Sequence, residues 1–375
     1  MNRVAFAAAV LAAGGLILAA PFISRFRNLL RTTFPDHDVL LLALIVAGAI
    51  AAAAVAALVR IRDRRRQRLG LIAAALAIGA VYSLLTSSDD PHVAAVERFH
   101  FVQYGLITFL FYRAWRPLGD AGVLVLPAIA AMLTAVVEEW FQWFIPGRVG
   151  VMQDVLLNGA AIVCGLLFSL GFDPPRLTLT CGGRTLRHAG VAGALLVVVF
   201  GLFFDAVHLG HAIRHPRIGT FPSLFSEAEL RAHAEDRARR WQSDPPIDRT
   251  RLAREDQYRT EGIQHVQARN EAWARGDSDR ALREQQILET YYAPVLRRGH
   301  DWPAEQRADA VNRASASEAD AASTFVSRAY PYTVYTWPGT LVWPTVLLIA
   351  AGLLTFAWRA AARREGAGAR STPTT

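Results

Sequence analysis

The chain alternates between long apolar stretches and short polar segments over most of its 375 residues. Apolar stretches near the membrane-spanning length fall at 4–22, 39–59, 69–86, 94–113, 121–141, 151–170, 189–208 and 341–358. The stretch 39–59 has no polar side chain, and its length as a helix, about 31 Å, matches the hydrocarbon core of a bilayer. The pattern predicts an all-α fold, a polytopic transmembrane helix bundle of about eight spans.

The segment 210–338 has a different composition, with 19 arginines against 19 aspartates and glutamates and few apolar positions. Helix-start signals are a capping box at Ser226–Glu229 and N-cap candidates at Asp277 and Asp301. We therefore predict a helical extracytoplasmic domain here. The expected division is three spans in 1–92, a transmembrane core in 93–170, a loop and span in 171–209, the charged domain in 210–338, and the last span and tail in 339–375.

The distribution of arginine predicts the orientation, because positively charged loops stay in the cytoplasm. The loop 60–68 carries six arginines, and placing it inside puts sixteen arginines in cytoplasmic segments against five in short outer ones. We expect a multi-pass protein of a bacterial inner (plasma) membrane with both termini cytoplasmic. The net charge of +8 is then a topology signal, and no nucleic-acid partner is expected. The first stretch is interpreted as an uncleaved anchor rather than a signal peptide, since Pro21 follows the small residue Ala20.

Ionisable groups inside a bilayer are costly, at about 2.5–3.5 kcal/mol each, so their placement is informative. Here the polar residues gather at the predicted outer ends of the fourth, fifth and sixth spans. Spacings of three and four residues place their members on shared helical faces. Asn158 is also in line with Ala161 and Gly165, small residues that allow close helix approach. The candidate binding residues are Glu97, His100, Tyr104, Glu139, Gln142, Arg148, Asp154 and Asn158.

These residues carry a family resemblance. The motifs Glu139-Trp-Phe-Gln142, Pro146-Gly-Arg148 and Asp154-Val-Leu-Leu-Asn158-Gly159 resemble the VanZ-like signature Glu-x-x-Gln, Pro-x-Arg, Asp-x-x-x-Asn-Gly. The resemblance covers about 95–170, although Arg98 and Gln103 depart from the lysine and the acid usual upstream. It implies an integral protein of the bacterial cell envelope, in a family associated with low-level, teicoplanin-type glycopeptide resistance and lacking an established reaction.

Three functions are compatible with this pattern. The first is binding of a lipid-linked or cell-wall component, with Arg148 holding an anion that Glu139 and Asp154 orient. The second is a membrane transferase or hydrolase with Glu139 or Asp154 as catalytic base. The third is an assembly protein whose 210–338 domain recruits an extracytoplasmic protein partner. In that case the polar residues only join helices, for example through a Gln142–Asn158 hydrogen bond or an ion pair of Arg148.

In a second group, Asp205 and His208 share a helical face, as do His211 and His215, at a spacing that metal ligands can use. We interpret these residues as interfacial side chains rather than metal ligands. No Walker loop, dinucleotide fingerprint, Gly-x-Ser-x-Gly or His-Glu-x-x-His motif is present, so the sequence predicts no cofactor.

Overall fold

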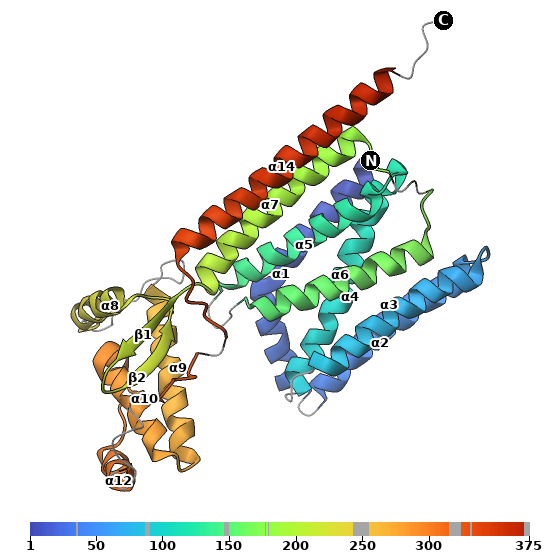
Figure 1. The fold of residues 1–375 in the computed structure, drawn as a ribbon. Coiled ribbons are helices and arrows are strands. Elements are labelled where there is room, and N and C mark those ends of the chain that lie inside the picture. Colours follow the sequence, from blue (N-terminus) through green and yellow to red (C-terminus); the bar gives the residue numbers. More distant parts are fainter. Residues whose placement is uncertain are drawn as a thin grey trace, which may run out of the picture. The chain divides into compact units, whose positions relative to one another are not determined.

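The computed structural model describes residues 1–34, 37–86, 91–145, 150–176, 178, 180–242, 255–314, 324–330 and 332–370. The chain forms two compact units, Met1–Phe203 with Thr340–Thr375, and Phe204–Gly339. The first contains the long helices (Figure 1). They are α1 Arg3–Thr33, α2 Asp38–Arg60, α3 Arg65–Thr86, α4 Pro91–Trp115, the short 3₁₀ helix η1 Arg116–Leu118, α5 Gly122–Gln142, α6 Met152–Phe172, α7 Gly183–Val207 and α14 Gly339–Arg370.

Seven helices in the described part of the chain are long and apolar enough to cross a membrane, so the protein is a multi-pass membrane protein by helix length and composition. They are α1, α2, α3, α5, α6, α7 and α14. The fourth expected span, 94–113, lies on α4, which is not among the seven and carries Glu97, Arg98 and Arg113. The predicted helix bundle is confirmed, and the count of eight stays a prediction.

Helix α4 packs against α1, α2, α5 and α6. Its apolar side chains Tyr104, Ile107 and Phe111 form a core with small residues of the surrounding helices, including Ala9 of α1 and Ala161 of α6. Polar side chains on such a helix can face protein instead of lipid, which lowers the cost of placing them there.

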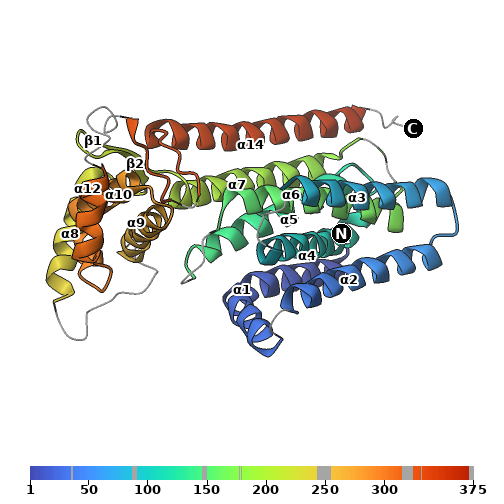
Figure 2. The same cartoon turned by 90° about the horizontal axis from the view of Figure 1, so that it is seen from below.

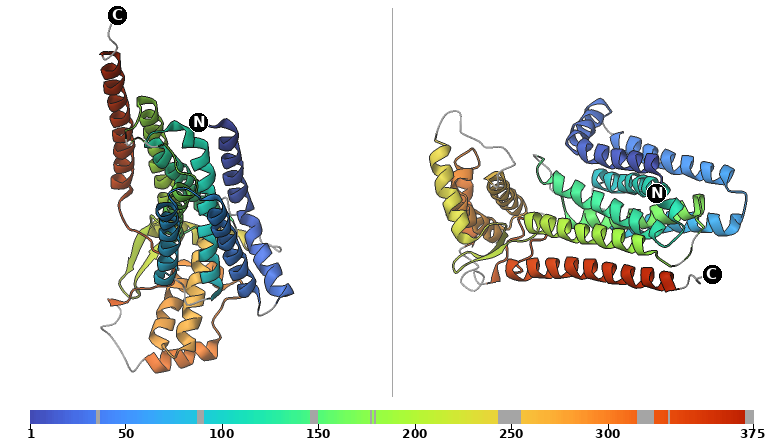
Figure 3. Two further views of the ribbon diagram at one scale, coloured as in Figure 1. Left: turned by 90° about the vertical axis from the view of Figure 1, so that its right-hand side faces the viewer. Right: turned by 90° about the horizontal axis from the view of Figure 1, so that it is seen from above.

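Close helix contacts in this unit are made by glycines. A Cβ at Gly171 of α6 would lie 2.6 Å from the Arg68 carbonyl oxygen of α3. The buried Arg68 donates from Nε to the Gly171 carbonyl (2.8 Å) and from Nη2 to the Phe172 carbonyl (2.7 Å), so its charge satisfies the C-terminal end of α6. Helix α14 runs beside α7 in every view (Figures 1, 2 and 3), and Gly190 of α7 faces Ala357 of α14.

The second unit combines a β-hairpin with helices. Strands β1 His211–His215 and β2 Gly219–Ser223 pair antiparallel, with Ile213 opposite Phe221. The helices are α8 Glu227–Arg240, α9 Glu255–Ala274, α10 Ser278–Tyr291, α11 Ala293–Leu296 and α12 Ala304–Ala314. The prediction of an entirely helical segment was therefore wrong for 211–223. The turn between the strands is followed by Gly219, whose φ of +111° is readily adopted only by glycine.

The helix-start signals of this unit were partly correct. The capping box is confirmed, with the Ser226 side chain accepting from the Glu229 N–H and the Glu229 carboxylate accepting from the Ser226 N–H. Asp277 caps α10 by accepting from the Arg280 N–H at 3.1 Å. The expectation for Asp301 was wrong, because α12 begins only at Ala304. Ile213, Phe221, Leu230, Tyr258, Ile287 and Tyr292 belong to the core.

Candidate functional site

Helix α4 places two aromatic side chains in the interior of the first unit. His100 and Tyr104 lie one turn apart with their rings stacked, at a centroid separation of 6.2 Å and an interplanar angle of 6°. Both side chains are buried, Tyr104 completely. The predicted common face of these two residues is confirmed.

The last turn of α5 supplies two carboxyl groups and an amide. Glu138 Oε2 accepts a hydrogen bond from the Tyr104 hydroxyl at 3.3 Å, which joins α5 to α4. The Gln142 amide nitrogen donates to Glu138 Oε1 at 2.8 Å and to Glu139 Oε1 at 3.2 Å. All three α5 side chains are buried, so this end of the helix holds polar groups in an apolar bundle.

Helix α6 completes the cluster with Asn158, which is 0% exposed. Its Oδ1 lies 2.8 Å from Nδ1 of His100, a hydrogen bond in which the imidazole N–H donates. The other amide atom, Nδ2, has no hydrogen-bond partner among the residues that the structure describes. We call His100, Tyr104, Glu138, Glu139, Gln142 and Asn158 the polar cluster.

Glu97 and Asp154 lie outside this interior group. Each is half-buried: Glu97 lies on α4 one turn before His100, and Asp154 lies on α6 one turn before Asn158. Asp154 therefore lies at the edge of the polar cluster. Its position in the first turn of α6 suits a negative charge, because helix N-termini carry positive partial charge. Arg148, the expected anion-binding residue, lies outside the described residues.

The polar cluster involves three helices, α4, α5 and α6, and not only the pair α5 and α6. The described contacts of Gln142 and Asn158 are with Glu138, Glu139 and His100, and no hydrogen bond joins Gln142 to Asn158. Helix α4 links the two instead, through the stacked rings of His100 and Tyr104. The Gln142–Asn158 hydrogen bond, considered above as one way of joining the helices, is therefore absent between these two described residues.

Sequence reasoning missed Glu138, which makes the contact between α5 and α4. The available signal was its spacing of four residues from Gln142, which places both side chains on one face. Glu139, three residues from Gln142, fits the same face, so spacing alone did not rank the two acids.

Small residues allow the three helices to come this close. A Cβ at Gly165 would lie 2.9 Å from Thr108 Cβ and 3.0 Å from Gly105 Cα, so α6 meets α4 at Gly165. A Cβ at Gly150 would overlap the Glu139 carbonyl oxygen at 1.8 Å, which shows how tightly the chain before α6 passes the end of α5. The predicted close approach below Asn158 is confirmed.

The second group of candidates does not form a common site. Helix α7 ends at Val207, so His211 and His215 lie on strand β1, about 13 Å apart along it at four strand residues. His208 Nδ1 donates to the Thr333 carbonyl (2.9 Å), while Asp205 is exposed on the last turn of α7. The expected helical spacing of the histidines was wrong. Within the described residues, no group of three or more His, Cys, Asp or Glu could hold a metal ion.

Chemically, the polar cluster offers carboxyl oxygens as acceptors and the Asn158 amide as a donor. A hydroxyl group can satisfy both, since it donates one hydrogen and accepts through its lone pairs. A molecule with several hydroxyls is therefore the best match to the described part of the cluster.

Comparison with known proteins found no matching family model, no matching curated protein and no matching solved structure.

Proposed function

We propose that the chain is a VanZ-like integral membrane protein of the bacterial cell envelope. In this proposal the polar cluster binds the headgroup of a lipid-linked or cell-wall component. The observation that carries it is the fully buried Asn158, whose Nδ2 lacks a partner in the described structure while its Oδ1 is bonded to His100.

The energetics argue against packing as the only role. A buried polar group without a hydrogen bond costs about 1–3 kcal/mol. An interhelical hydrogen bond within a membrane contributes only about 0.6 kcal/mol on average. A cluster that includes an unsatisfied amide therefore contributes less to the stability of the folded protein than apolar side chains of similar size would. A bound group that accepts from Asn158 removes the penalty, so ligand binding accounts for an arrangement that packing does not.

In the proposed topology the polar cluster is accessible from the outer leaflet of the membrane. With both termini in the cytoplasm and α4 crossing the membrane as the fourth of eight spans, the end of α5 and the start of α6 lie at the outer face. A headgroup in the outer leaflet would then reach the polar cluster from the edge where Asp154 and Glu97 lie. Polyhydroxylated headgroups, such as those of lipid-linked sugars, have the donors and acceptors that this cluster matches.

The test is native mass spectrometry of the full chain purified from its own membranes in mild detergent. Wild-type protein is expected to retain an amphiphile that Asn158→Leu loses by about ten-fold or more, since the side chain keeps its approximate volume but loses both hydrogen-bonding atoms. Ser169→Ala is the matched control, because Ser169 is buried on the same helix and, among the described residues, its hydroxyl bonds only within that helix, to the Gly165 carbonyl. Equal retention by wild type and Asn158→Leu would refute the proposal.

The same preparation separates binding from catalysis. If the cluster only binds, Glu139→Gln leaves the retained amphiphile chemically unchanged. A modified form of the amphiphile that accumulates with wild type and disappears with Glu139→Gln would instead identify an enzyme.

A further inference from the structure

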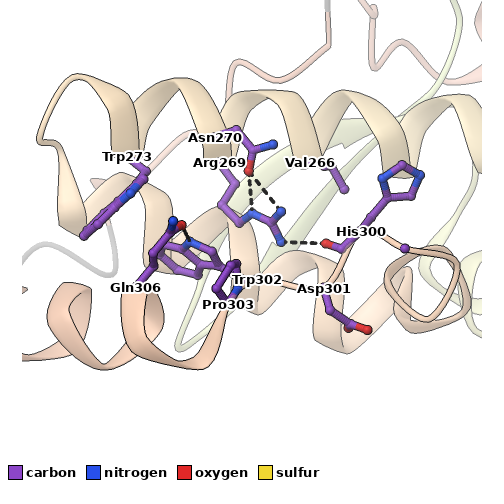
Figure 4. A pocket seen from close by; sticks show the side chains of 10 residues that line it. Val266, Arg269, Asn270, Trp273, His300, Asp301, Trp302, Pro303 and Gln306 are labelled. Atoms are coloured by element: carbon purple, nitrogen blue, oxygen red, sulfur yellow. Dashed lines mark hydrogen bonds between the residues drawn. The ribbon is translucent and has the colours of Figure 1, made fainter.

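A cavity of about 340 Å³ lies in the second unit, between α9, the loop before α12 and the first turns of α12 (Figure 4). Its size is in the range of small-molecule sites, which are typically about 300–1,000 Å³. One part of its wall is aromatic, formed by Trp273 and Trp302, whose rings meet edge to face at 5.7 Å. The rest of the wall is mainly polar.

Arg269 is the buried charged group of this wall, at only 3% exposed, and the wall also includes the exposed Asp301. Its guanidinium donates to Asn270 Oδ1 (3.1 and 3.0 Å), to Gln285 Oε1 (2.7 Å) and to the His300 carbonyl (3.1 Å), and it lies over the Trp302 ring. All these acceptors are neutral. Among the described residues no carboxylate forms an ion pair with Arg269, and burial lowers its pKa. A buried arginine with only neutral partners can still be stabilised by an anion.

Two amide side chains of the wall have orientations fixed by chemistry. A guanidinium and an indole N–H can only donate, so Asn270 must turn its oxygen toward Arg269, and Gln306 must turn its oxygen toward Trp302 Nε1 at 3.1 Å. Asn270 and Gln306 are both exposed, so their NH₂ groups face solvent and are accessible to a ligand, and no residue that the structure describes accepts from them. In Figure 4 the Asn270 nitrogen points away from the guanidinium, and the Asp301 side chain points away from Arg269.

We propose that this cavity binds a small organic carboxylate that carries a ring. The carboxylate accepts from Arg269 and from the NH₂ groups of Asn270 and Gln306, because charge-assisted hydrogen bonds from arginine suit a carboxylate. The ring packs against Trp273 and Trp302, which supply apolar surface next to these donors. The inference is independent of the function proposed for the polar cluster, since it involves only the second unit.

The test uses the full chain in lipid nanodiscs and isothermal titration calorimetry. D-glucuronate and benzoate are the probes, with D-glucose and benzyl alcohol as neutral counterparts and sulfate as an anion without a ring. We expect at least one carboxylate to bind about ten-fold more tightly than both its counterpart and sulfate. Preference for glucuronate would identify a sugar acid, and preference for benzoate an aromatic acid. Equal binding of sulfate, or of the neutral counterpart, would overturn the proposal.

Two substitutions change the charge next to Arg269 in opposite ways. Asn270→Asp supplies an internal counter-charge and should weaken carboxylate binding about ten-fold, whereas Asp301→Asn removes a nearby negative charge and should strengthen it. Gln267→Glu is the control, because it makes the same charge change as Asn270→Asp at an exposed position of α9 outside the cavity wall. Asp301 is exposed, so its variant tests the proposal even if Asn270→Asp does not fold. Unchanged affinity in Asp301→Asn, or in a folded Asn270→Asp, would contradict it.

Discussion

The crossing of α4 and α6 can be tested with two glycine-to-alanine substitutions that differ only in what the new methyl group meets. At Gly165 the Cβ would lie 2.9 Å from Thr108 Cβ and 3.0 Å from both the Cα and the carbonyl oxygen of Gly105. Ordinary van der Waals contact for a Cβ begins at 3.4 Å, and part of this obstacle is backbone. The two helices must therefore separate by several tenths of an ångström. At Gly105 a Cβ meets nothing within 4 Å.

The magnitudes follow from these two environments. Replacing a helical glycine by alanine stabilises a protein by about 0.4–1 kcal/mol when the methyl group fits, because the unfolded chain loses freedom. We expect this gain for Gly105→Ala. Gly165→Ala has the same gain but also a cost of about 1–3 kcal/mol from overpacking. The difference between the two variants isolates the packing cost and should be about 1–3 kcal/mol.

The assay is reversible unfolding of the full chain in mixed micelles with increasing sodium dodecyl sulfate, followed by circular dichroism. Gly165→Ala should unfold at a lower detergent fraction than wild type, and Gly105→Ala at the same or a higher fraction. If Gly165→Ala proves as stable as Gly105→Ala, the close contact of α4 and α6 described here is incorrect.

Three further substitutions test other parts of the structure. Burial alone would raise the pKa of Asp120, but hydrogen bonds from the Gly182 N–H, the Thr185 hydroxyl and the Gly122 N–H lower it from 3.8. The stability it contributes should be present above about pH 4 and lost as the pH falls through the folded-state value, so melting temperatures between pH 6 and 3 should fall more for wild type than for Asp120→Asn. Glu138→Gln should lower the free energy of unfolding by about 1 kcal/mol, because Glu138 accepts from Tyr104 at one oxygen and from Gln142 at the other, and glutamine has only one oxygen. An unchanged free energy of unfolding in the micelle assay would contradict these two contacts. Gly219→Ala should cost about 1–3 kcal/mol, since it combines a positive φ with a Cβ 2.4 Å from the Phe325 carbonyl oxygen, and hydrogen exchange in β1 and β2 should then speed up.

Helical periodicity was sufficient to predict which side chains share a face of a single helix. The common face of His100 and Tyr104 and the small residues in line with Asn158 follow from spacing alone. The choice between Glu138 and Glu139 depends on where α4 lies relative to α5, which periodicity within α5 does not contain. For the same reason, the His100–Asn158 bond, which joins residues 58 apart in sequence, could not be predicted.

Local signals failed where one pattern fits two structures. The four-residue spacing of His211 and His215 suits a helix, but it also places both residues on the same side of a strand, which is what β1 is. Asp301 precedes a helix-favouring run, yet α12 begins later and the Asp301 side chain is exposed beside the cavity. The cavity is lined by residues of α9 and of the loop around His300, which are distant in sequence. No sequence motif indicates that these two segments lie together.

Ligand binding by the polar cluster can be seen directly in a cryo-electron microscopy map of the full chain, extracted from its own membranes into lipid nanodiscs. We expect non-protein density within hydrogen-bonding distance of Asn158 Nδ2, extending toward the Glu138 and Glu139 carboxyl groups. A map in which a protein side chain accepts from that amide, with no further density in the polar cluster, would contradict it.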